Sequence, residues 1–417
     1  MGLSWFYSRT VRRAGHMLKH VDRHISAQRD ILASGEMEKI KVARDELRGA
    51  VRNSQPRQEI RAKMDNMEKV ANNNFRPYPS AAWRENIEVL LVAIAVAMGI
   101  RTFFVQPFKI PTGSMQPTLY GITSTPDYTP RASTPEPPAE PDFEVPNPIV
   151  RFLKFWYAGV SYTHIKARRD GRFAGDGPPK RFLLFNLYQS FRLQTPSGEF
   201  DNYHVWFPTD NLFVRAGLST PYGYNPRVFK AGEDIMKIKV ISGDHLFVDR
   251  MSYNFRRPKL GEIIVFETRG IRHPSMPQDQ FYIKRMVAMG GNKVQIGNDR
   301  HLRLDGKRLD TNTPHFERIY SFPPDRPPMD SVYSGHLNET VARQYGMSLA
   351  ALFETENEVF TVQPDHYIVM GDNTVNSSDS RTWGDFPQQN VIGKSFLVYW
   401  PFGPQDGRKS RFGWGNR

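Results

Sequence analysis

Residues 280–289 read QFYIKRMVAM, an alternating run that places Lys284 among apolar side chains. Alternation of apolar and polar residues over this length is typical of a half-buried β-strand. Similar short runs fill the second half of the chain: IMKIKV at 235–240, HLFVDR at 245–250, EIIVFE at 262–267, KVQI at 293–296, HLRLDG at 301–306, HYIVMG at 366–371 and SFLVYW at 395–400. Short strands at such close spacing predict an all-β or mainly β body with coiled sheets.

The composition limits the classes of protein that fit. The 417 residues are enough for two or three domains, and with 39% hydrophobic and 24% charged residues most of the chain should fold. A composition this polar excludes a membrane protein with many spans. The chain has no cysteine, which excludes a disulfide framework, a thiolate metal site and a cysteine nucleophile. The formal net charge of +13 invites a nucleic-acid or anionic-lipid partner, although charge alone identifies neither.

One stretch is long and apolar enough to cross a bilayer, namely IEVLLVAIAVAMGIRTFFV at 87–105. As a helix it is roughly 28 Å long, close to the ~30 Å hydrocarbon core. The alternative interpretation is a buried core helix. A removable secretory signal is not expected, because 86 residues precede the run. Residues 1–82 hold 16 Lys/Arg against 9 Asp/Glu, so the positive-inside rule predicts a cytoplasmic N-terminus and an external remainder.

The flanking segments differ in character. Residues 1–80 have widely spaced apolar residues among charges, which predicts helices; these form either a regulatory arm or a solvated extension. Residues 121–149 are rich in Pro, Ser, Thr and acidic residues and are predicted to be an extended linker. Residues 150–230 are aromatic and rich in turns, which predicts a small β-containing insert.

Two local features suggest nucleophilic chemistry. In Pro111–Leu119 (PTGSMQPTL), Gly113 precedes Ser114 between stiffening prolines, and a rigid turn that presents a hydroxyl and a free N–H suits an acyl-transfer nucleophile. The alternative is an ordinary turn. Lys284, held among apolar neighbours, would lose solvation of its charged form and become a general base; the alternative is a lysine that faces solvent.

A third feature is the dense polar loop at 371–387, GDNTVNSSDSRTWGDFP. Its small hydroxyl residues could orient an amine base, and its Asp/Arg pair could hold the loop in place. The histidines, such as His245, His273 and His366, are scattered and show no zinc-ligand spacing, so no metal site is predicted.

Together these three features resemble, in order and wording, the sequence boxes of bacterial type I signal peptidases, a family of Ser–Lys serine proteases. The boxes are a PSGSMxPTL-like nucleophile box, GDxVxV, GDIVVF, YIKR and GDNxxNSxDSRxWG. This chain has GDHLFV at 243–248 and GEIIVF at 261–266 in the second and third slots. The resemblance covers 87–119 and roughly 232–402. It implies a coiled antiparallel β-sheet catalytic domain preceded by one transmembrane helix and a helical arm.

The resemblance assigns roles residue by residue. Ser114 matches the nucleophile and Lys284 the general base. Thr112 stands where many members have serine and would join the Ser114 N–H in the oxyanion hole, and Ser377 matches the hydroxyl that orients the lysine. The remaining matches are a structural ion pair involving Asp379, Arg381 and Arg285, and pockets for the small residues of an A-x-A cleavage site lined by Phe108, Ile110, Met115, Leu119, Tyr282 and Ile283.

The implied protein is a single-pass enzyme of the bacterial inner membrane that cleaves signal peptides from exported preproteins. Its implied partners are signal peptides and membrane lipid, with the translocation machinery as a further candidate; no cofactor and no nucleic acid are expected. The predicted domains are 1–82 (cytoplasmic arm), 83–106 (transmembrane helix), 107–120 with 232–296 (catalytic core), 121–231 (linker and insert), 297–364 (β-rich non-catalytic subdomain) and 365–417 (return to the core and C-terminal tail).

The chain departs from the family in the long stretch between the serine box and Gly243, in its single span after a long basic arm, and at Glu262, where Asp is common. None of these departures touches the Ser–Lys dyad. Two rival interpretations remain: a LexA-like self-cleaving regulator, for which residues 1–80 show no clear helix-turn-helix, and a membrane-tethered scaffold with vestigial catalytic boxes.

Overall fold

The computed structural model describes eight ranges of the chain: 8–76, 81–129, 142–182, 185–220, 223–274, 276–321, 335–405 and 408–414. The chain divides into two compact units, Met1–Val96 and Ala97–Arg417. Residues 130–141 of the predicted linker lie outside the described residues.

Three helices form a bundle in the first unit: α2 (Arg9–Gln28), α3 (Ser34–Arg52) and α4 (Arg57–Asn74). Their core includes Val11, Ala14, Leu18 and Val21 of α2, which recur at the spacing of one helix face, and fully buried Ile40 and Leu47 of α3. The sequence correctly predicted helices here. Their widely spaced apolar residues make a shared core, so the segment is not a set of separately solvated helices.

The helix α5 (Ala81–Phe103) follows, and its stretch Trp83–Phe103 is long and apolar enough to cross a membrane. None of that stretch is buried in the structure, so the alternative of a buried core helix does not hold. Arg84 pairs with Glu88 near its start, and Arg101 lies in its last turn.

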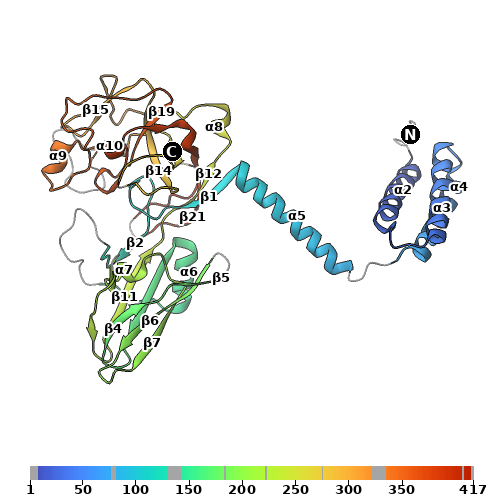
Figure 1. Cartoon of the computed structure of the whole chain (residues 1–417), viewed down its shortest axis with the longest axis horizontal. Helices are drawn as coiled ribbons and strands as arrows, with labels where there is room; N and C mark the ends of the chain where they lie inside the picture. Colours follow the sequence, from blue (N-terminus) through green and yellow to red (C-terminus); the bar gives the residue numbers. More distant parts are fainter. Residues whose placement is uncertain are drawn as a thin grey trace. The chain divides into compact units, whose positions relative to one another are not determined.

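The second unit is built around a seven-stranded antiparallel sheet in the order β1-β12-β21-β13-β14-β19-β20 (Figure 1). The strands are β1 (Val105–Lys109), β12 (His245–Asp249), β21 (Val391–Trp400), β13 (Ile263–Glu267), β14 (Phe281–Met289), β19 (His366–Met370) and β20 (Phe386–Pro387). Short helices join them: α8 (Ser252–Phe255), α10 (Ser380–Trp383), η1 (Thr374–Asn376) and η2 (Gln388–Asn390). The predicted mainly β, coiled antiparallel fold is confirmed.

The sheet curls, so that strands far apart in its order meet. β1 is the edge strand and β14 is the fifth, yet the rings of Phe108 on β1 and Phe281 on β14 lie 5.4 Å apart. A core cluster that includes buried Leu246, Val265 and Val398 fills the inside of the curl. This curvature brings the segment after β1 toward β14.

A smaller four-stranded sheet, β17-β16-β15-β18, has three of its strands in the range 297–364 that was predicted to be a β-rich subdomain, and β15 just before it. Its strands are β15 (Lys293–Ile296), β16 (Leu302–Leu304), β17 (Lys307–Arg308) and β18 (Phe360–Thr361), and α9 (Glu339–Arg343) accompanies it. Val287 and Ile368 of the large sheet share its core with Phe316 and Phe353, so the two sheets are packed together.

The insert, together with β2 before it and β11 after it, forms two further sheets. One has the order β2-β11-β3, with β2 (Thr123–Thr125), β11 (Asp234–Ile241) and β3 (Val160–Lys166). The other joins β10 (Val228–Phe229), β4 (Gly171–Asp176), β6 (Phe185–Gln194), β5 (Lys180–Phe182) and β7 (Phe200–Trp206). The helix α7 (Leu212–Arg215) and the pair β8 (Ser219–Thr220) and β9 (Gly223–Tyr224) complete it. Buried Phe173, Phe191 and Phe213 give it a core of its own.

The linker expectation was wrong in part, because the stretch includes strand β2, whose three residues pair with β11. The β-containing insert is confirmed by its strands. Its aromatic run begins with a helix, α6 (Pro148–Ala158). Asn147 caps its first turn, Pro148 opens it, and Gly159 ends it in the left-handed conformation with φ of 66°. These capping residues outweigh the β propensity of the aromatic side chains.

Candidate active site

Ser114 lies in the turn that follows β1 and is almost fully buried, with 4% of its surface exposed. The turn is held on two sides. The backbone N–H of Ile122 donates to the carbonyl of Pro111 at 3.3 Å. The backbone N–H of Asn373 donates to the Ser114 carbonyl at 3.0 Å, and Asn373 Nδ2 donates to the Gly113 carbonyl at 3.2 Å. The turn therefore presents Ser114 in a fixed position.

Lys284 lies in the middle of β14, with 5% of its surface exposed, and its Nζ is 2.7 Å from Ser114 Oγ. Burial lowers the pKa of Lys284 from 10.5 to about 8, although the nearby carboxylates of Asp379 and Asp372 act to raise it. A buried serine hydroxyl thus shares a hydrogen bond with an amine that loses its proton close to neutral pH. This is the arrangement of an activated nucleophile and its base.

Asp379 and Arg381 form a buried ion pair, with Nε to Oδ1 at 2.8 Å and Nη2 to Oδ2 at 2.9 Å. Burial acts to raise the pKa of Asp379, but Arg381 and the hydrogen bonds to the carboxylate outweigh it and the pKa is lowered. Asp379 also accepts a hydrogen bond from the Gly371 backbone N–H at 2.9 Å, and Arg381 donates to Thr374 Oγ1. The pair stabilises the loop that closes over the lysine.

Arg285 belongs to a separate ion pair. Its guanidinium binds Asp372 through two hydrogen bonds, of 2.7 Å from Nε and 2.5 Å from Nη2, and also donates to the Gly261 carbonyl at 2.7 Å. Asp372 in turn accepts from Thr118 Oγ1 at 2.5 Å. The sequence grouped Arg285 with Asp379 and Arg381 and missed Asp372. A buried arginine requires a buried counter-charge, but both the burial of Arg285 and its partner depend on the pairing of β14 with β19.

A further buried pair, which the sequence also missed, supports the other end of the turn. Arg411 binds Asp244 through hydrogen bonds of 2.7 and 2.8 Å, and Asp244 Oδ2 accepts from the Tyr120 backbone N–H at 2.8 Å. Asp244 lies in the motif GDHLFV at 243–248, whereas Arg411 lies in the C-terminal tail, in which the sequence analysis found no motif. The serine turn is therefore fixed from three directions.

The two auxiliary hydroxyl groups are placed differently. Thr112 is exposed, two residues before Ser114. Within the described part of the chain the Ser114 backbone N–H donates to no protein acceptor. Ser377 Oγ is buried and makes no hydrogen bond of ordinary geometry to a described residue, but it lies close enough to Asp379 to contribute to the lowered pKa of that carboxyl. The orienting role of Ser377 toward Lys284 stays a prediction.

The residues expected to line substrate pockets fall into two groups. Ile110, Met115 and Leu119 expose 2%, 0% and 0% of their surface and pack in the core inside the curl, so they present no open surface to a ligand here. Phe108, Tyr282 and Ile283 are partly exposed along the strands beside the dyad. A lining role for the second group stays a prediction.

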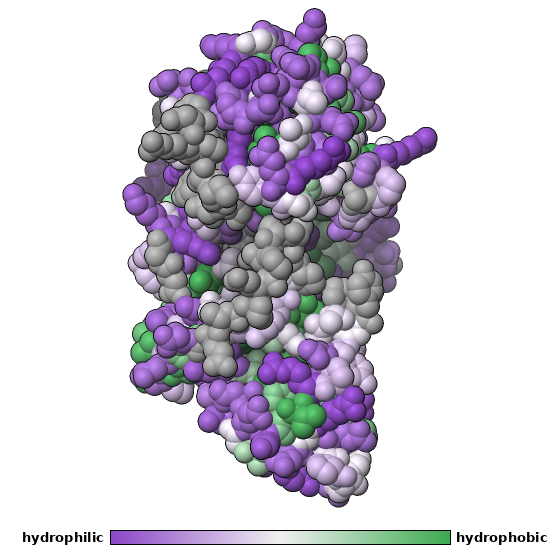
Figure 2. Space-filling view, turned by 90° about the vertical axis from the view of Figure 1, so that its left-hand side faces the viewer, coloured by the Kyte–Doolittle hydropathy of each residue, from purple (hydrophilic) through white to green (hydrophobic). Residues whose placement is uncertain are grey.

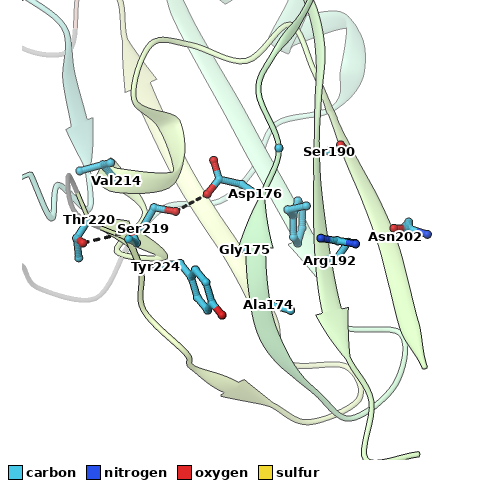
Figure 3. A pocket seen from close by; sticks show the side chains of 13 residues that line it. Ala174, Gly175, Asp176, Ser190, Arg192, Asn202, Val214, Ser219, Thr220 and Tyr224 are labelled. Carbon is cyan, nitrogen blue, oxygen red and sulfur yellow. Dashed lines mark hydrogen bonds between the residues drawn. The ribbon is translucent and has the colours of Figure 1, made fainter. Parts of the chain in front are cut away.

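A cavity of about 670 Å³ lies elsewhere, in the insert (Figure 3). Asp176 accepts a hydrogen bond from Ser219 Oγ at its wall, and Arg192 and Tyr224 lie around it (Figure 3). None of the residues in its lining belongs to the dyad or its supports, so its volume says nothing about the chemistry at Ser114.

The curled sheet and the buried Ser114–Lys284 pair form the arrangement expected of a serine hydrolase that uses an amine as its base. Comparison with known families identifies it further: the family described as signal peptidase, peptidase S26, matches residues 83–125 and 228–400. The chain belongs to this family. The match omits residues 126–227, which form most of the insert.

Several similar proteins are named signal peptidase I. The chain is 29% identical over 159 residues to signal peptidase I of Leptolyngbya laminosa, covering 38% of this chain and 61% of that protein. It is 33% identical over 174 residues to a probable signal peptidase I-1 of Synechocystis, covering 40% and 68%. A solved signal peptidase I from Enterococcus faecalis V583 shares 23% identity, with a TM-score of 0.23, over 33% of this chain and 97% of that one. The chain spans about three fifths of the length of the first relative.

Proposed function

We propose that this protein is a membrane-anchored serine endopeptidase that removes signal peptides from exported preproteins. The observation that carries the proposal is the 2.7 Å hydrogen bond between Lys284 Nζ and Ser114 Oγ, formed between two buried groups. Membership of the signal peptidase family supports it. The names of the relatives supply the substrate class.

The geometry supports a two-step mechanism. Neutral Lys284 accepts the hydroxyl proton as Ser114 Oγ attacks the carbonyl carbon of the scissile bond, and the lysine then delivers that proton to the leaving amine. The free N–H of Ser114 and the hydroxyl of Thr112 would hold the oxyanion of the tetrahedral intermediate. Water, deprotonated by the same lysine, hydrolyses the resulting acyl-enzyme.

Two unpaired strand edges offer a place for the substrate. β1 is an edge strand that pairs only with β12 among the described strands. On β14, pairing with β19 starts at Arg285, so the β19-facing edge of residues 281–284 is left without a strand partner in the described structure. An extended peptide that pairs with these edges would lie beside the dyad, and backbone hydrogen bonds would bind it with little dependence on sequence.

The anchor determines where the enzyme works. We infer that α5 spans the bacterial inner membrane once, with the N-terminal bundle in the cytoplasm and the chain after Gln106 outside. β1 begins two residues after α5 ends, so the serine turn follows the span closely in the chain. A cleavage site that emerges from the membrane would meet it there. Membrane lipid and the translocation machinery are the further partners that this location implies.

The deciding experiment is cleavage of a purified preprotein by the full chain in detergent. Ser114→Ala and Lys284→Ala should each abolish cleavage, because the two groups act as one unit. Lys293→Ala, which changes an exposed lysine on β15, is the matched control and should cleave normally. Near-normal turnover by either dyad variant, with folding verified by circular dichroism, would show that the assignment is wrong.

A further inference from the structure

The helix α6 of the insert is well defined at both ends. The side chain of Asn147 accepts a hydrogen bond from the Val150 backbone N–H at 2.9 Å, and the Gly159 N–H bonds back to Phe155 at 2.9 Å. These caps satisfy backbone groups that would otherwise be left unpaired, so the helix keeps its form even though one face lacks protein contacts.

One face of α6 binds the protein through polar and aromatic contacts. Arg151 donates to the Tyr162 carbonyl on β3 at 2.8 Å, and Lys154 Nζ donates to the Tyr162 hydroxyl at 3.2 Å. At the other end, Trp400 Nε1 donates to the Trp156 carbonyl at 2.8 Å, and the rings of Phe155 and Trp400 lie 6.0 Å apart. The helix is therefore fixed to both β3 of the insert and β21 of the catalytic sheet.

The opposite face is apolar and open. Ile149, Phe152, Leu153 and Trp156 follow the i, i+3, i+4, i+7 spacing of a single stripe, and they are 74%, 62%, 59% and 56% exposed. On a surface helix of a water-soluble domain such a stripe faces the core. Here it faces outward, while Arg151 and Lys154 lie on the other face and hydrogen-bond to Tyr162. On the view in Figure 2, by contrast, hydrophilic residues cover most of the described surface and hydrophobic ones form small separate patches.

We propose that this stripe of α6 lies in the interfacial layer of the membrane that α5 spans, as a second attachment of the catalytic unit. Apolar helix faces that contain Trp, Phe and Leu bury in this way at the boundary between headgroups and acyl chains. The exposed stripe measures on the order of 500 Å², below the ~800 Å² that each partner of a stable protein interface contributes. Contact with the bilayer does not require so large an area, because the proposed anchor α5 already holds the catalytic unit close to the membrane.

The absence of cysteine from the chain makes a direct test possible. A Phe152→Cys variant of the full chain carries one fluorescent label and is reconstituted in phosphatidylcholine/phosphatidylglycerol vesicles. Val359→Cys, at an isolated position that is 49% exposed, is the matched control. Lipids brominated on their acyl chains should quench the label at position 152, and iodide in the water should quench it at least fivefold less than the label at 359.

Equal iodide quenching at both positions would overturn the proposal. So would protection at position 152 that disappears when the protein is diluted into excess lipid, since that result indicates contact between copies. This test makes no use of protease activity, so it separates failure of the membrane contact from failure of the proposed function. It does rest on the proposed insertion of α5.

A second experiment measures the consequence for processing and rests on the proposed function. The double variant Phe152→Asp/Trp156→Asp should cleave a soluble peptide in detergent at the normal rate. On a preprotein inserted in vesicles its rate should fall at least tenfold, whereas Val359→Asp should be normal on both substrates. An equal loss on both substrates, or no loss on either, would contradict the proposed role in processing.

Discussion

Lys284 Nζ and Ser114 Oγ are 2.7 Å apart, although 170 residues separate them in the chain. Curling of the sheet brings β14 against the turn after β1, and the same packing removes both side chains from water. A lysine in water would be protonated near neutral pH and unable to accept a proton. The fold therefore does more than place Lys284 beside Ser114, because its packing also lowers the pKa of Lys284, as the proposed role of base requires.

The rate of cleavage should depend on the protonation of Lys284. Burial lowers its pKa from 10.5 to about 8, and only the neutral amine can accept the Ser114 proton. We therefore expect kcat/KM to rise about tenfold per pH unit below pH 8 and to level off above it. A pH profile measured with a peptide substrate checks this. A rise that continues unchanged toward pH 10 would mean that the lysine is not desolvated.

Lys284→Met should make the protein inactive but more stable at pH 7. A pKa of about 8 in the folded state against 10.5 when unfolded corresponds to about 3 kcal/mol of destabilisation by the buried charge. Loss of the hydrogen bond to Ser114 lowers the free energy of unfolding by about 1 kcal/mol, so the variant should be more stable by about 2 kcal/mol in total.

The pH dependence of that gain gives the control. Between pH 8 and pH 10.5 the unfolded chain binds a proton at Lys284 that the folded chain does not, so the stability of the unchanged protein rises with pH. The advantage of Lys284→Met should therefore shrink over this range. Thermal unfolding in detergent at several pH values measures it, and an advantage independent of pH would point to packing as the cause.

Arg285→Met should be strongly destabilising. It leaves Asp372 buried without its counter-charge, a change that costs about 3–5 kcal/mol. In the double variant Arg285→Met/Asp372→Leu both charges are gone, and at least half of the lost stability should return. Thermal unfolding of both variants tests this coupling. If the double variant is less stable than the single one, the pair is not acting as a unit.

The mainly β fold and the candidate pair Ser114 and Lys284 could be predicted from the sequence because both depend on local signals. The strands alternate over a few residues, and Ser114 and Lys284 lie within short motifs. The partner of Arg285 was not predicted, because Asp372 reaches it only through the pairing of β14 with β19. Arg411 illustrates the same limit, since its tail comes to lie against Asp244 only in the folded chain.

The insert shows a second kind of limit. The residues of α6 are aromatic and apolar, which by composition favours a strand, but Asn147, Pro148 and Gly159 specify a helix. The outward direction of its apolar stripe could not be predicted from periodicity, which gives a face but not what that face contacts. The N-terminal bundle is similar, because periodicity predicted helices without showing that they share one core.

Membrane orientation gives a further prediction. By the positive-inside rule, the excess of basic residues in 1–82 predicts that the N-terminal bundle lies in the cytoplasm. Protease added to spheroplasts should therefore digest the region after Gln106 and leave α2, α3 and α4 intact, as detected with antibodies to each part. Permeabilised cells, in which both parts are accessible, are the control. Digestion of the bundle in intact spheroplasts would reverse the proposed orientation.

A variant that lacks residues 124–228, closed by a short Gly/Ser loop, should still cleave a peptide in detergent. No strand of the seven-stranded sheet and no member of the dyad or its supports lies within that range. The deletion should lower the stability of the protein, because it removes β3 and most of β2, the two strands that flank β11. Met236, Ile238 and Val240 of β11 would then be exposed to water. We therefore expect lower stability with retained peptide cleavage.

Cleavage of membrane-inserted preprotein by this deletion variant should fall more than peptide cleavage, because α6 is lost as well. A folded deletion variant that cleaves no peptide would show that the insert helps to build the active site. The first contact to examine would then be the ion pair between Lys109 of β1 and Asp210 of the insert.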